Sequence, residues 1–314
     1  MSLNTGEQNR LQSPLVATRS SWREFGRMLV VLFKLRIVAL LLLAAVGGAF
    51  LGARGWPGLE NLSLLLLTGG MAAAGASALN QYIERTSDVM MSRTRQRPLP
   101  SGQIERPRFV VGIGVALIVV PSLLVLPFNA ALAFWLLAGA VIYVGVYTIW
   151  LKPRTLLNIV IGGAAGSAAV MSGGAAVDAW QDPTVITLAL LLFLWTPSHF
   201  WALAILYKKD YQRADVPMLP ARIGTQQAAW WVLLHTGATG LAALLLALSP
   251  ALGWLYFLPV LGATIDLMWR NARLIKEPTP RNARSLFLAS NVYLTVVLVA
   301  ALASSVLHGL WAVL

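Results

Sequence analysis

The sequence predicts an all-α polytopic membrane protein with nine transmembrane helices, and two observations lead to that fold class. First, the chain of 314 residues is 58% hydrophobic and only 11% charged, with a mean hydropathy of +0.71. A soluble domain averages about 25% charged residues, so this much apolar surface requires a lipid environment. Second, almost all basic residues fall in alternate loops between apolar stretches, which is the pattern that orients membrane helices.

The elements follow from the apolar stretches, taking about 20 residues for each span. A polar stretch of mixed charge without the apolar core of a signal peptide comes first, and we interpret residues 1–27 as a cytoplasmic tail. A single transmembrane domain is expected at residues 28–310. Its nine helices are expected near residues 31–53, 61–83, 109–126, 130–149, 157–177, 184–206, 227–248, 252–269 and 286–307. Glycine and alanine in stretches such as Gly69–Gly75 and Ile161–Gly166 allow neighbouring helices to approach closely.

The basic residues give the orientation of the nine spans. Every Lys and Arg except Arg54 lies in the stretch from the N-terminus through the first turn of the first span, or in the loops after the second, fourth, sixth and eighth spans with their flanks. Positively charged loops stay in the cytoplasm, so the N-terminus is expected there and the C-terminus in the periplasm. This distribution explains the net charge of +12 as an orientation signal, without nucleic acid as a partner. The chain has no cysteine, which excludes disulfides and thiolate metal sites.

A stripe of polar residues follows the second apolar stretch. If the helix continues, Asn80, Glu84 and Asp88 advance by about 40° at each step and share one face at the membrane edge. Carboxylates at that depth are costly and usually functional. The basic residues Arg93 and Arg97 come next. An amide and two carboxylates beside arginines suit a divalent cation that carries a phosphorylated ligand. The alternative is a set of ordinary surface acids paired with nearby arginines.

The loop after the sixth span, Tyr207–Pro220, repeats this mixture of acid and base. It contains Lys209, Asp210, Tyr211 and Asp215, and the charge pattern places it on the same side of the membrane as the first stripe. We therefore interpret the two loops as two halves of one diphosphate site at the cytoplasmic face.

Several motifs resemble those of the UbiA superfamily of intramembrane prenyltransferases, and within it the branch that farnesylates heme. The resemblance covers roughly residues 30 to 305, in order. The motifs are Asn80-x-x-x-Glu84-x-x-x-Asp88 with Arg97-Pro-Leu, Tyr147–Lys152, Trp195-Thr-Pro-Ser-His199-Phe-Trp201, Pro217-Met-Leu-Pro220 and Ala283–Phe287. The first motif departs from many members, which carry another aspartate where this chain has Thr86 and Ser87, and which often have aspartate at the position of Glu84.

The resemblance implies a UbiA-type bundle with farnesyl diphosphate as donor and heme b as acceptor. The farnesyl chain would join the 2-vinyl group, giving heme O and diphosphate. It also implies Mg²⁺, with Mn²⁺ as the alternative, held by Asn80, Glu84, Asp88 and Asp210. Asp215 stands where glycine or asparagine is more usual in the family, so Asp210 is the preferred ligand. The residues expected to contact substrate are Lys34, Arg36, Arg93, Arg97, Lys152, Lys209 and Tyr211.

His199 is the candidate for a contact with heme. A histidine within an apolar helix is usually a hydrogen-bonded core residue, which is the competing interpretation. Its position between Trp195 and Trp201, just before the second loop, favours axial ligation, a propionate contact or proton transfer. The expected location is a bacterial inner membrane, with the mitochondrial inner membrane as the alternative. Expected partners are small-molecule substrates, the lipid bilayer and a heme A synthase.

Three other functions stay open at this point. A prenyltransferase acting on an aromatic acid or quinone precursor would share the first motif. A secondary transporter would place its ionisable residues near the membrane centre within broken helices, whereas these gather at helix ends on one face. A catalytically silent assembly factor would have no need to retain the acidic stripe.

Overall fold

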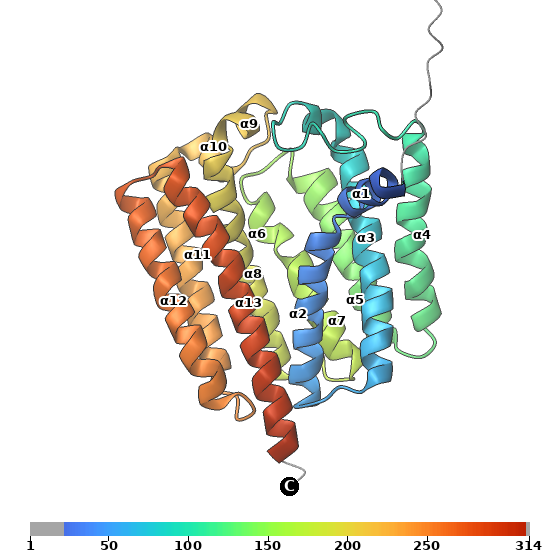
Figure 1. Ribbon diagram of the computed structural model, residues 1–314, viewed down its shortest axis with the longest axis vertical. Coiled ribbons are helices and arrows are strands. Elements are labelled where there is room, and N and C mark those ends of the chain that lie inside the picture. Colours follow the sequence, from blue (N-terminus) through green and yellow to red (C-terminus); the bar gives the residue numbers. More distant parts are fainter. Residues whose placement is uncertain (1–21, 312–314) are drawn as a thin grey trace, which may run out of the picture.

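The protein is a bundle of long helices that stand side by side (Figure 1). The computed structural model describes residues 22–311, so most of the expected tail, residues 1–21, lies outside the described residues. The helices are α1 (Trp22–Leu32), α2 (Leu35–Ala53), α3 (Leu59–Val89), α4 (Pro107–Val125), α5 (Ala130–Ala140), the π-helix η1 (Val141–Leu151), α6 (Asn158–Gly162), α7 (Ala164–Ala176), α8 (Pro183–Leu206), α9 (Lys208–Arg213), α10 (Leu219–Ile223), α11 (Thr225–Leu246), α12 (Gly253–Lys276) and α13 (Pro280–Trp311).

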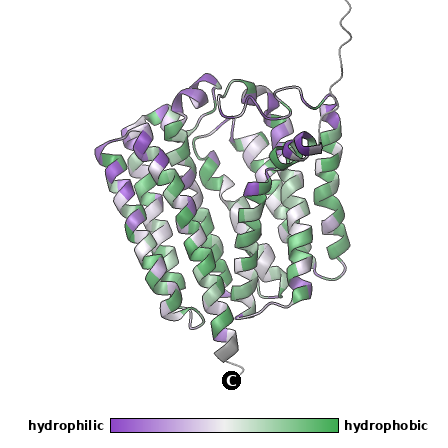
Figure 2. Cartoon of the chain, viewed as in Figure 1, coloured by the Kyte–Doolittle hydropathy of each residue, from purple (hydrophilic) through white to green (hydrophobic). Residues whose placement is uncertain are grey.

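The chain is a multi-pass membrane protein. Within the described residues, eight helical segments are long and apolar enough to cross a bilayer. Hydrophobic residues cover the middle of the bundle, and hydrophilic residues gather at the end that carries α9 and α10 (Figure 2). The prediction of a largely apolar bundle with one polar end is therefore correct.

The exact count of nine spans stays a prediction because of α12. This helix packs against α11 and α13 and runs alongside α13 (Figure 1). It is not among the eight segments that qualify by length and apolarity. Asp266, Arg270 and Arg273 lie in its second half and lower its mean hydropathy.

Two expected spans differ from straight α-helices. The span expected at 130–149 continues from α5 into η1, an 11-residue π-helix. Such helices are rare and occur frequently at functional sites. The span expected at 157–177 is divided into α6 and α7 at Gly163. A Cβ atom on Gly163 would lie 3.0 Å from the carbonyl oxygen of Phe193, so α8 closely approaches the backbone at this break.

The start of the bundle also differs from expectation. The boundary expected between residues 27 and 28 falls inside α1, which lies across the bundle near its polar end (Figure 1). Lys34 adopts a left-handed backbone conformation with φ 49°, and this residue separates α1 from α2. The sharp turn brings the Lys34 side chain to the end of α3.

Small residues bring helices into direct backbone contact, as the sequence predicted. A Cβ atom on Gly173 of α7 would lie 1.7 Å from the carbonyl oxygen of Ala45 in α2. A Cβ atom on Gly75 of α3 would lie 2.5 Å from the carbonyl oxygen of Gly114 in α4. Lipid tails are as apolar as the helix surfaces, so the hydrophobic effect does not bring helices together in a membrane. They associate through close van der Waals packing instead.

Replacing Gly173 with alanine should therefore destabilise the bundle. The new methyl group would force α2 and α7 apart, and overpacking of this kind costs about 3 kcal/mol at its upper range. We expect a clearly lower midpoint of thermal unfolding in detergent. Gly112→Ala is the matched control, since no atom of residues 22–311 lies within 4 Å of a Cβ atom there. Equal midpoints for the two variants would contradict the close approach of α2 and α7.

Candidate functional site

The last turns of α3 carry the predicted polar stripe. The helix continues to Val89, so Asn80, Glu84 and Asp88 do lie on one α-helix. Asn80 and Asp88 are buried, with 2% and 3% of their surfaces exposed. Glu84 is almost as buried, because only 10% of its side-chain surface is exposed. Polar groups buried to this degree need partners, and each of the three has one.

Lys34 and η1 hold the amide of Asn80 from opposite sides. Lys34 donates to Asn80 Oδ1 at 2.5 Å and to the Tyr143 hydroxyl at 3.1 Å. Asn80 Nδ2 donates to Thr148 Oγ1 at 3.0 Å, and Thr148 in turn donates to the carbonyl oxygen of Tyr143 at 2.7 Å. Because the Thr148 hydroxyl hydrogen is committed to that carbonyl, Thr148 accepts from Asn80. The amide oxygen of Asn80 is therefore turned toward Lys34.

Glu84 forms an ion pair and hydrogen bond with Lys152, which directly follows η1. Burial disfavours the charge of Lys152, but the Glu84 carboxylate outweighs it and raises the pKa of Lys152 above its ordinary value. Burial, followed by the positive charge of Arg97, lowers the pKa of Lys34 to about 7. The two lysines thus differ: Lys152 faces a carboxylate, whereas Lys34 faces an amide and a phenol.

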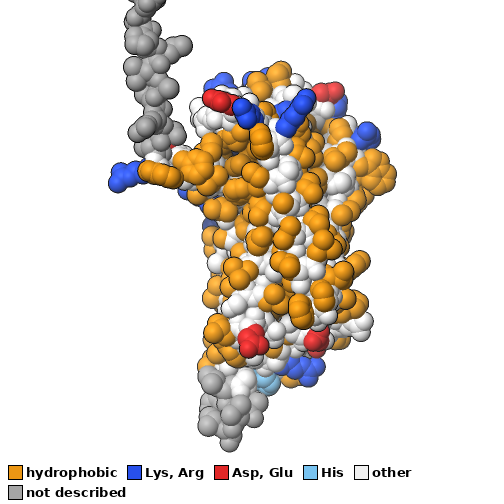
Figure 3. Space-filling model, turned by 90° about the vertical axis from the view of Figure 1, so that its right-hand side faces the viewer, with side chains coloured by type: hydrophobic (Ala, Val, Ile, Leu, Met, Phe, Trp, Pro, Cys, Tyr) orange, Lys and Arg blue, Asp and Glu red, His pale blue; other side chains and the backbone are white. Residues whose placement is uncertain are grey.

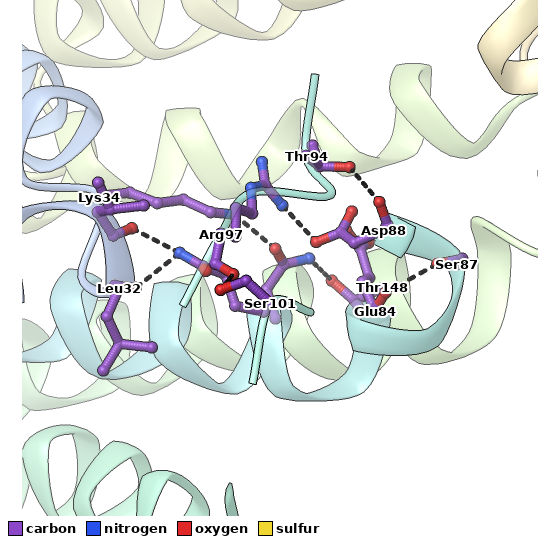
Figure 4. A network of polar contacts seen from close by, with 12 residues as sticks. Leu32, Lys34, Glu84, Ser87, Asp88, Thr94, Arg97, Ser101 and Thr148 are labelled. Carbon is purple, nitrogen blue, oxygen red and sulfur yellow. Dashed lines mark hydrogen bonds and ion pairs between the residues drawn. The ribbon is translucent and has the colours of Figure 1, made fainter. Parts of the chain in front are cut away.

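Asp88 pairs with Arg97, which comes from the loop after α3. Arg97 Nη1 lies 2.7 Å from Asp88 Oδ2, and Thr94 Oγ1 donates to the carbonyl oxygen of Asp88 at 3.0 Å. Figure 4 shows Lys34, Arg97, Glu84, Asp88 and Thr148 in one polar network at the end of α3. Three basic side chains thus surround a stripe with two carboxylates.

The second acidic loop contacts the first through Asp210 of α9. Asp210 Oδ2 accepts from the backbone nitrogen of Ser92 at 3.0 Å and from its hydroxyl at 2.5 Å. Asp210 Oδ1 pairs with Arg213 at 2.6 Å. Ser92 lies in the same loop as Arg97, so the two acidic loops do meet at the polar end of the bundle. Figure 1 shows α9 beside this loop.

Other candidates from the second loop lie apart from this network. Asp215 has 88% of its side-chain surface exposed and a left-handed backbone with φ 50°, and among the described residues its ion-pair partner is Arg222. Lys209 is exposed, and Arg36 near the start of α2 is exposed as well. Tyr211 is buried in an apolar cluster with Met91, Ile159, Ala204, Val216 and Met218. That cluster packs the loop after α3 against α8 and α9.

Arg93 extends toward the second loop, with its guanidinium 5.9 Å from the centroid of the Tyr207 ring. Within residues 22–311, no group of three or more histidine, aspartate and glutamate side chains could by itself hold a metal ion. Carboxylates of the site are instead paired one by one with cations.

His199 occupies an aromatic box in α8. Its ring stacks on Trp195 and Phe287, with centroid distances of 4.3 and 4.5 Å, and Phe200 meets it edge-on at 5.1 Å. His199 Nδ1 lies 2.7 Å from Ser290 Oγ. Ser290 donates its own hydroxyl hydrogen to the carbonyl oxygen of Phe287 at 2.8 Å. Nδ1 is therefore the donor in the bond to Ser290, and Nε2 carries the lone pair.

Sequence reasoning missed the residues that orient the candidates. Thr148, Tyr143 and Ser92 make the bonds described above, yet each is an ordinary uncharged residue in the sequence. The only signal for Thr148 is that it lies within the Tyr147–Lys152 motif. Ser92 carries no signal, because its role depends on where α9 packs.

A Thr148→Val variant should show how much the orientation of the Asn80 amide contributes to the activity of the site. Valine keeps the shape of threonine but leaves Asn80 Nδ2 without its acceptor, which costs about 1–3 kcal/mol when the group is buried. We expect the rate of any reaction that depends on this site to fall about tenfold. Thr148→Ser restores the hydroxyl and should recover most of the loss. If Thr148→Ser is as impaired as Thr148→Val, the hydroxyl is not what matters.

The chain is similar to proteins of known function along most of its length. A model of the UbiA prenyltransferase family matches residues 40–297. Protoheme IX farnesyltransferase of Alkalilimnicola ehrlichii is 40% identical over 277 residues, which is 87% of this chain and 89% of that protein. Protoheme IX farnesyltransferase of Sulfolobus acidocaldarius is 40% identical over 281 residues, which is 88% of this chain and 96% of that protein.

Solved structures share the fold at low sequence identity. A structure of digeranylgeranylglyceryl phosphate synthase has a TM-score of 0.75 and 17% identity, covering 90% of this chain and 99% of that one. A UbiA homolog from Archaeoglobus fulgidus, bound to DMAPP and Mg²⁺, has a TM-score of 0.59 and 14% identity, covering 88% and 99%. The all-helical bundle is thus the fold found in these proteins.

Proposed function

Because this chain belongs to the UbiA prenyltransferase family, we infer that it is an intramembrane prenyltransferase that farnesylates heme. It transfers the farnesyl group of farnesyl diphosphate to the 2-vinyl group of protoheme IX, with addition of water, and releases heme O and diphosphate. The acceptor follows from the relatives named protoheme IX farnesyltransferase, which are 40% identical over most of the chain. The observation that carries the chemistry is the cation-rich network of Lys34, Arg97 and Lys152 around two buried carboxylates.

The reaction separates charge, and the site has to stabilise the charges that form. Breaking the allylic C–O bond leaves negative charge on diphosphate and positive charge on the farnesyl carbon. Lys34, Arg97 and Lys152 are the proposed donors to diphosphate oxygens, because they contact the three residues of the stripe at the end of α3. Arg93 is a further candidate from the same loop. Exposed Arg36 and Lys209 are weaker candidates, whereas Tyr211 acts through packing.

Mg²⁺, or Mn²⁺ in its place, fits the oxygen donors of the site. Asn80, Glu84, Asp88 and Asp210 would hold it, and hard cations of this kind bind a few carboxylates and take other ligands from phosphate and water. When bound, the metal neutralises charge on diphosphate as a Lewis acid. The link from Ser92 to Asp210 supports this set, since it joins the second acidic loop to the first.

The acceptor half of the reaction needs a site for heme and one water molecule. Attack of the vinyl group on the farnesyl carbon forms the C–C bond and leaves a cation next to the porphyrin ring. Water adds to that cation and loses a proton, which gives the hydroxyethylfarnesyl substituent. His199 is the proposed heme contact, because its Nε2 lone pair and its stacking rings suit a large planar ligand.

The cellular setting is part of the proposal. The distribution of basic residues supports a bacterial inner membrane location, with the N-terminus in the cytoplasm and the C-terminus in the periplasm. The polar end of the bundle then faces the cytoplasm. Heme O is the substrate that a heme A synthase would oxidise, so such an enzyme is the proposed partner.

The test is direct product analysis. Purified protein is incubated with heme b, farnesyl diphosphate and Mg²⁺, and extracted pigments are analysed by mass. A farnesylated and hydrated heme should appear, and it should be absent when a chelator is added. If heme returns unchanged while an aromatic acid or quinone precursor is prenylated, the heme assignment is wrong. No transfer to any acceptor by folded protein would favour a transporter or an assembly factor.

A further inference from the structure

A second basic site lies between α3 and α4, apart from the polar network at the end of α3. A pocket of about 400 Å³ opens between the end of α3 and the start of α4. Its walls combine three arginines, one carboxylate and two aromatic rings: Arg85, Arg106, Arg108, Glu105, Tyr82 and Phe109. At 100° per residue, Tyr82 and Arg85 lie about 160° and 100° around α3 from Glu84, the centre of the polar stripe. The pocket is therefore on a different face of the helix from the proposed diphosphate site.

The pocket carries an excess of positive charge. Three guanidinium groups face a single carboxylate, Glu105. Arg85 is held in place, because its Nη1 donates to the carbonyl oxygen of Tyr82 at 2.6 Å and its guanidinium lies 4.2 Å from the centroid of the Tyr82 ring. Arg106 and Arg108 are exposed, and neither forms an ion pair within residues 22–311. A guanidinium group can donate two parallel hydrogen bonds to two oxygens of one phosphate group.

An apolar strip leads from the pocket along the outside of α4. Phe109, Ile113, Val120 and Leu124 are 63%, 50%, 47% and 67% exposed. Their spacing of four, seven and four residues puts them on one face of the helix. Figure 3 views this side of the bundle and shows apolar side chains over its middle, with Lys and Arg near the end that carries the pocket. The pocket therefore sits where a polar rim meets a lipid-facing surface.

We propose that this pocket binds the phosphate headgroup of an anionic phospholipid whose acyl chains lie along α4. Basic pockets between transmembrane helices bind anionic lipid headgroups at the membrane surface. A free phosphate ion would use the arginines alone, whereas a phospholipid also uses the apolar strip that begins at Phe109. The strip is the reason to assign the lipid. This proposal does not depend on the farnesyl transfer reaction.

Lipid retention tests the proposal. The full chain is purified in detergent, supplied with phosphatidylglycerol or phosphatidylcholine, and bound lipid is counted by native mass spectrometry. The pocket variant is Arg106→Gln with Arg108→Gln. The matched control is Arg281→Gln with Arg284→Gln, which removes the same charge from exposed positions at the start of α13. We expect phosphatidylglycerol to bind the unmodified chain and the control, and to bind the pocket variant at least about tenfold more weakly.

Three outcomes would overturn the proposal. Equal retention of phosphatidylglycerol by the pocket variant and the control would mean that basic residues attract anionic lipid without a defined site. Inorganic phosphate is the second probe. If phosphate displaces phosphatidylglycerol from the unmodified chain and raises its unfolding midpoint as much as the lipid does, the pocket is a free-phosphate site. Phosphatidylcholine bound as tightly as phosphatidylglycerol would exclude a role for headgroup charge.

Discussion

An Asp88→Asn variant should lose heme farnesylation by a factor of about 10² to 10³, the range seen when one preorganised electrostatic group is removed from an active site. Asparagine has nearly the same shape as aspartate, so the change removes charge with little loss of packing. Asp88 is buried and pairs with Arg97 at 2.7 Å. Without the carboxylate, the proposed metal loses a ligand and Arg97 loses the partner that orients it toward diphosphate.

The measurement is the initial rate of product formation at saturating farnesyl diphosphate and heme, with the dependence on Mg²⁺ concentration. Asp88→Asn should need more Mg²⁺ for half-maximal rate, which a purely structural role would not cause. Asp215→Asn is the matched control, because the Asp215 side chain is 88% exposed and pairs with Arg222 at the surface. We expect the control to retain nearly full activity. Similar losses in both variants would indicate a general effect of charge and would refute the assigned site.

A His199→Phe variant should weaken heme binding by about a hundredfold, which corresponds to about 2.8 kcal/mol. Phenylalanine preserves the stacking on Trp195 and Phe287 but removes both ring nitrogens. If His199 contacts heme through Nε2, the variant loses that contact while the aromatic box stays filled. Binding of farnesyl diphosphate should be unchanged, because His199 lies outside the network at the end of α3.

Titration of heme b, followed by the absorption spectrum of the bound heme, measures this loss. His235→Phe serves as the control: His235 lies in α11, its Nδ1 is 3.0 Å from the carbonyl oxygen of Trp231, and it should tolerate the change. The competing interpretation makes His199 a core residue whose role is the bond to Ser290. In that case the unfolding midpoint of His199→Phe would fall while heme affinity and spectrum remained those of the unmodified chain.

Periodicity and charge in the sequence were enough to predict one part of the site. Residues spaced by four on a continuous helix must share a face, so the stripe of Asn80, Glu84 and Asp88 follows once α3 reaches Val89. The motif around His199 likewise predicted a special environment for that residue. Asp210 was preferred over Asp215 by resemblance, and the two residues do differ: one is buried beside Ser92, the other is exposed.

The basic residues that join the polar network at the end of α3 could not be predicted in the same way. Lys34, Arg36 and Lys209 look alike in sequence, yet only Lys34 joins the network. The left-handed turn at Lys34 directs its side chain inward, and a residue two positions later on α2 is exposed instead. Lysine and arginine have long flexible side chains, so their partners depend on which helix end lies within reach.

The sequence by itself determined the membrane bundle, the end of it where polar residues gather and the face of α3 that carries the acids. These are local properties, because they depend on apolar length, loop charge and helical repeat. Only the tertiary structure decided the pairing of Glu84 with Lys152, the contact of Ser92 with Asp210 and the orientation of Asn80 by Thr148. Each of these joins residues far apart in the chain, and such contacts arise from helix packing, which no local spacing specifies.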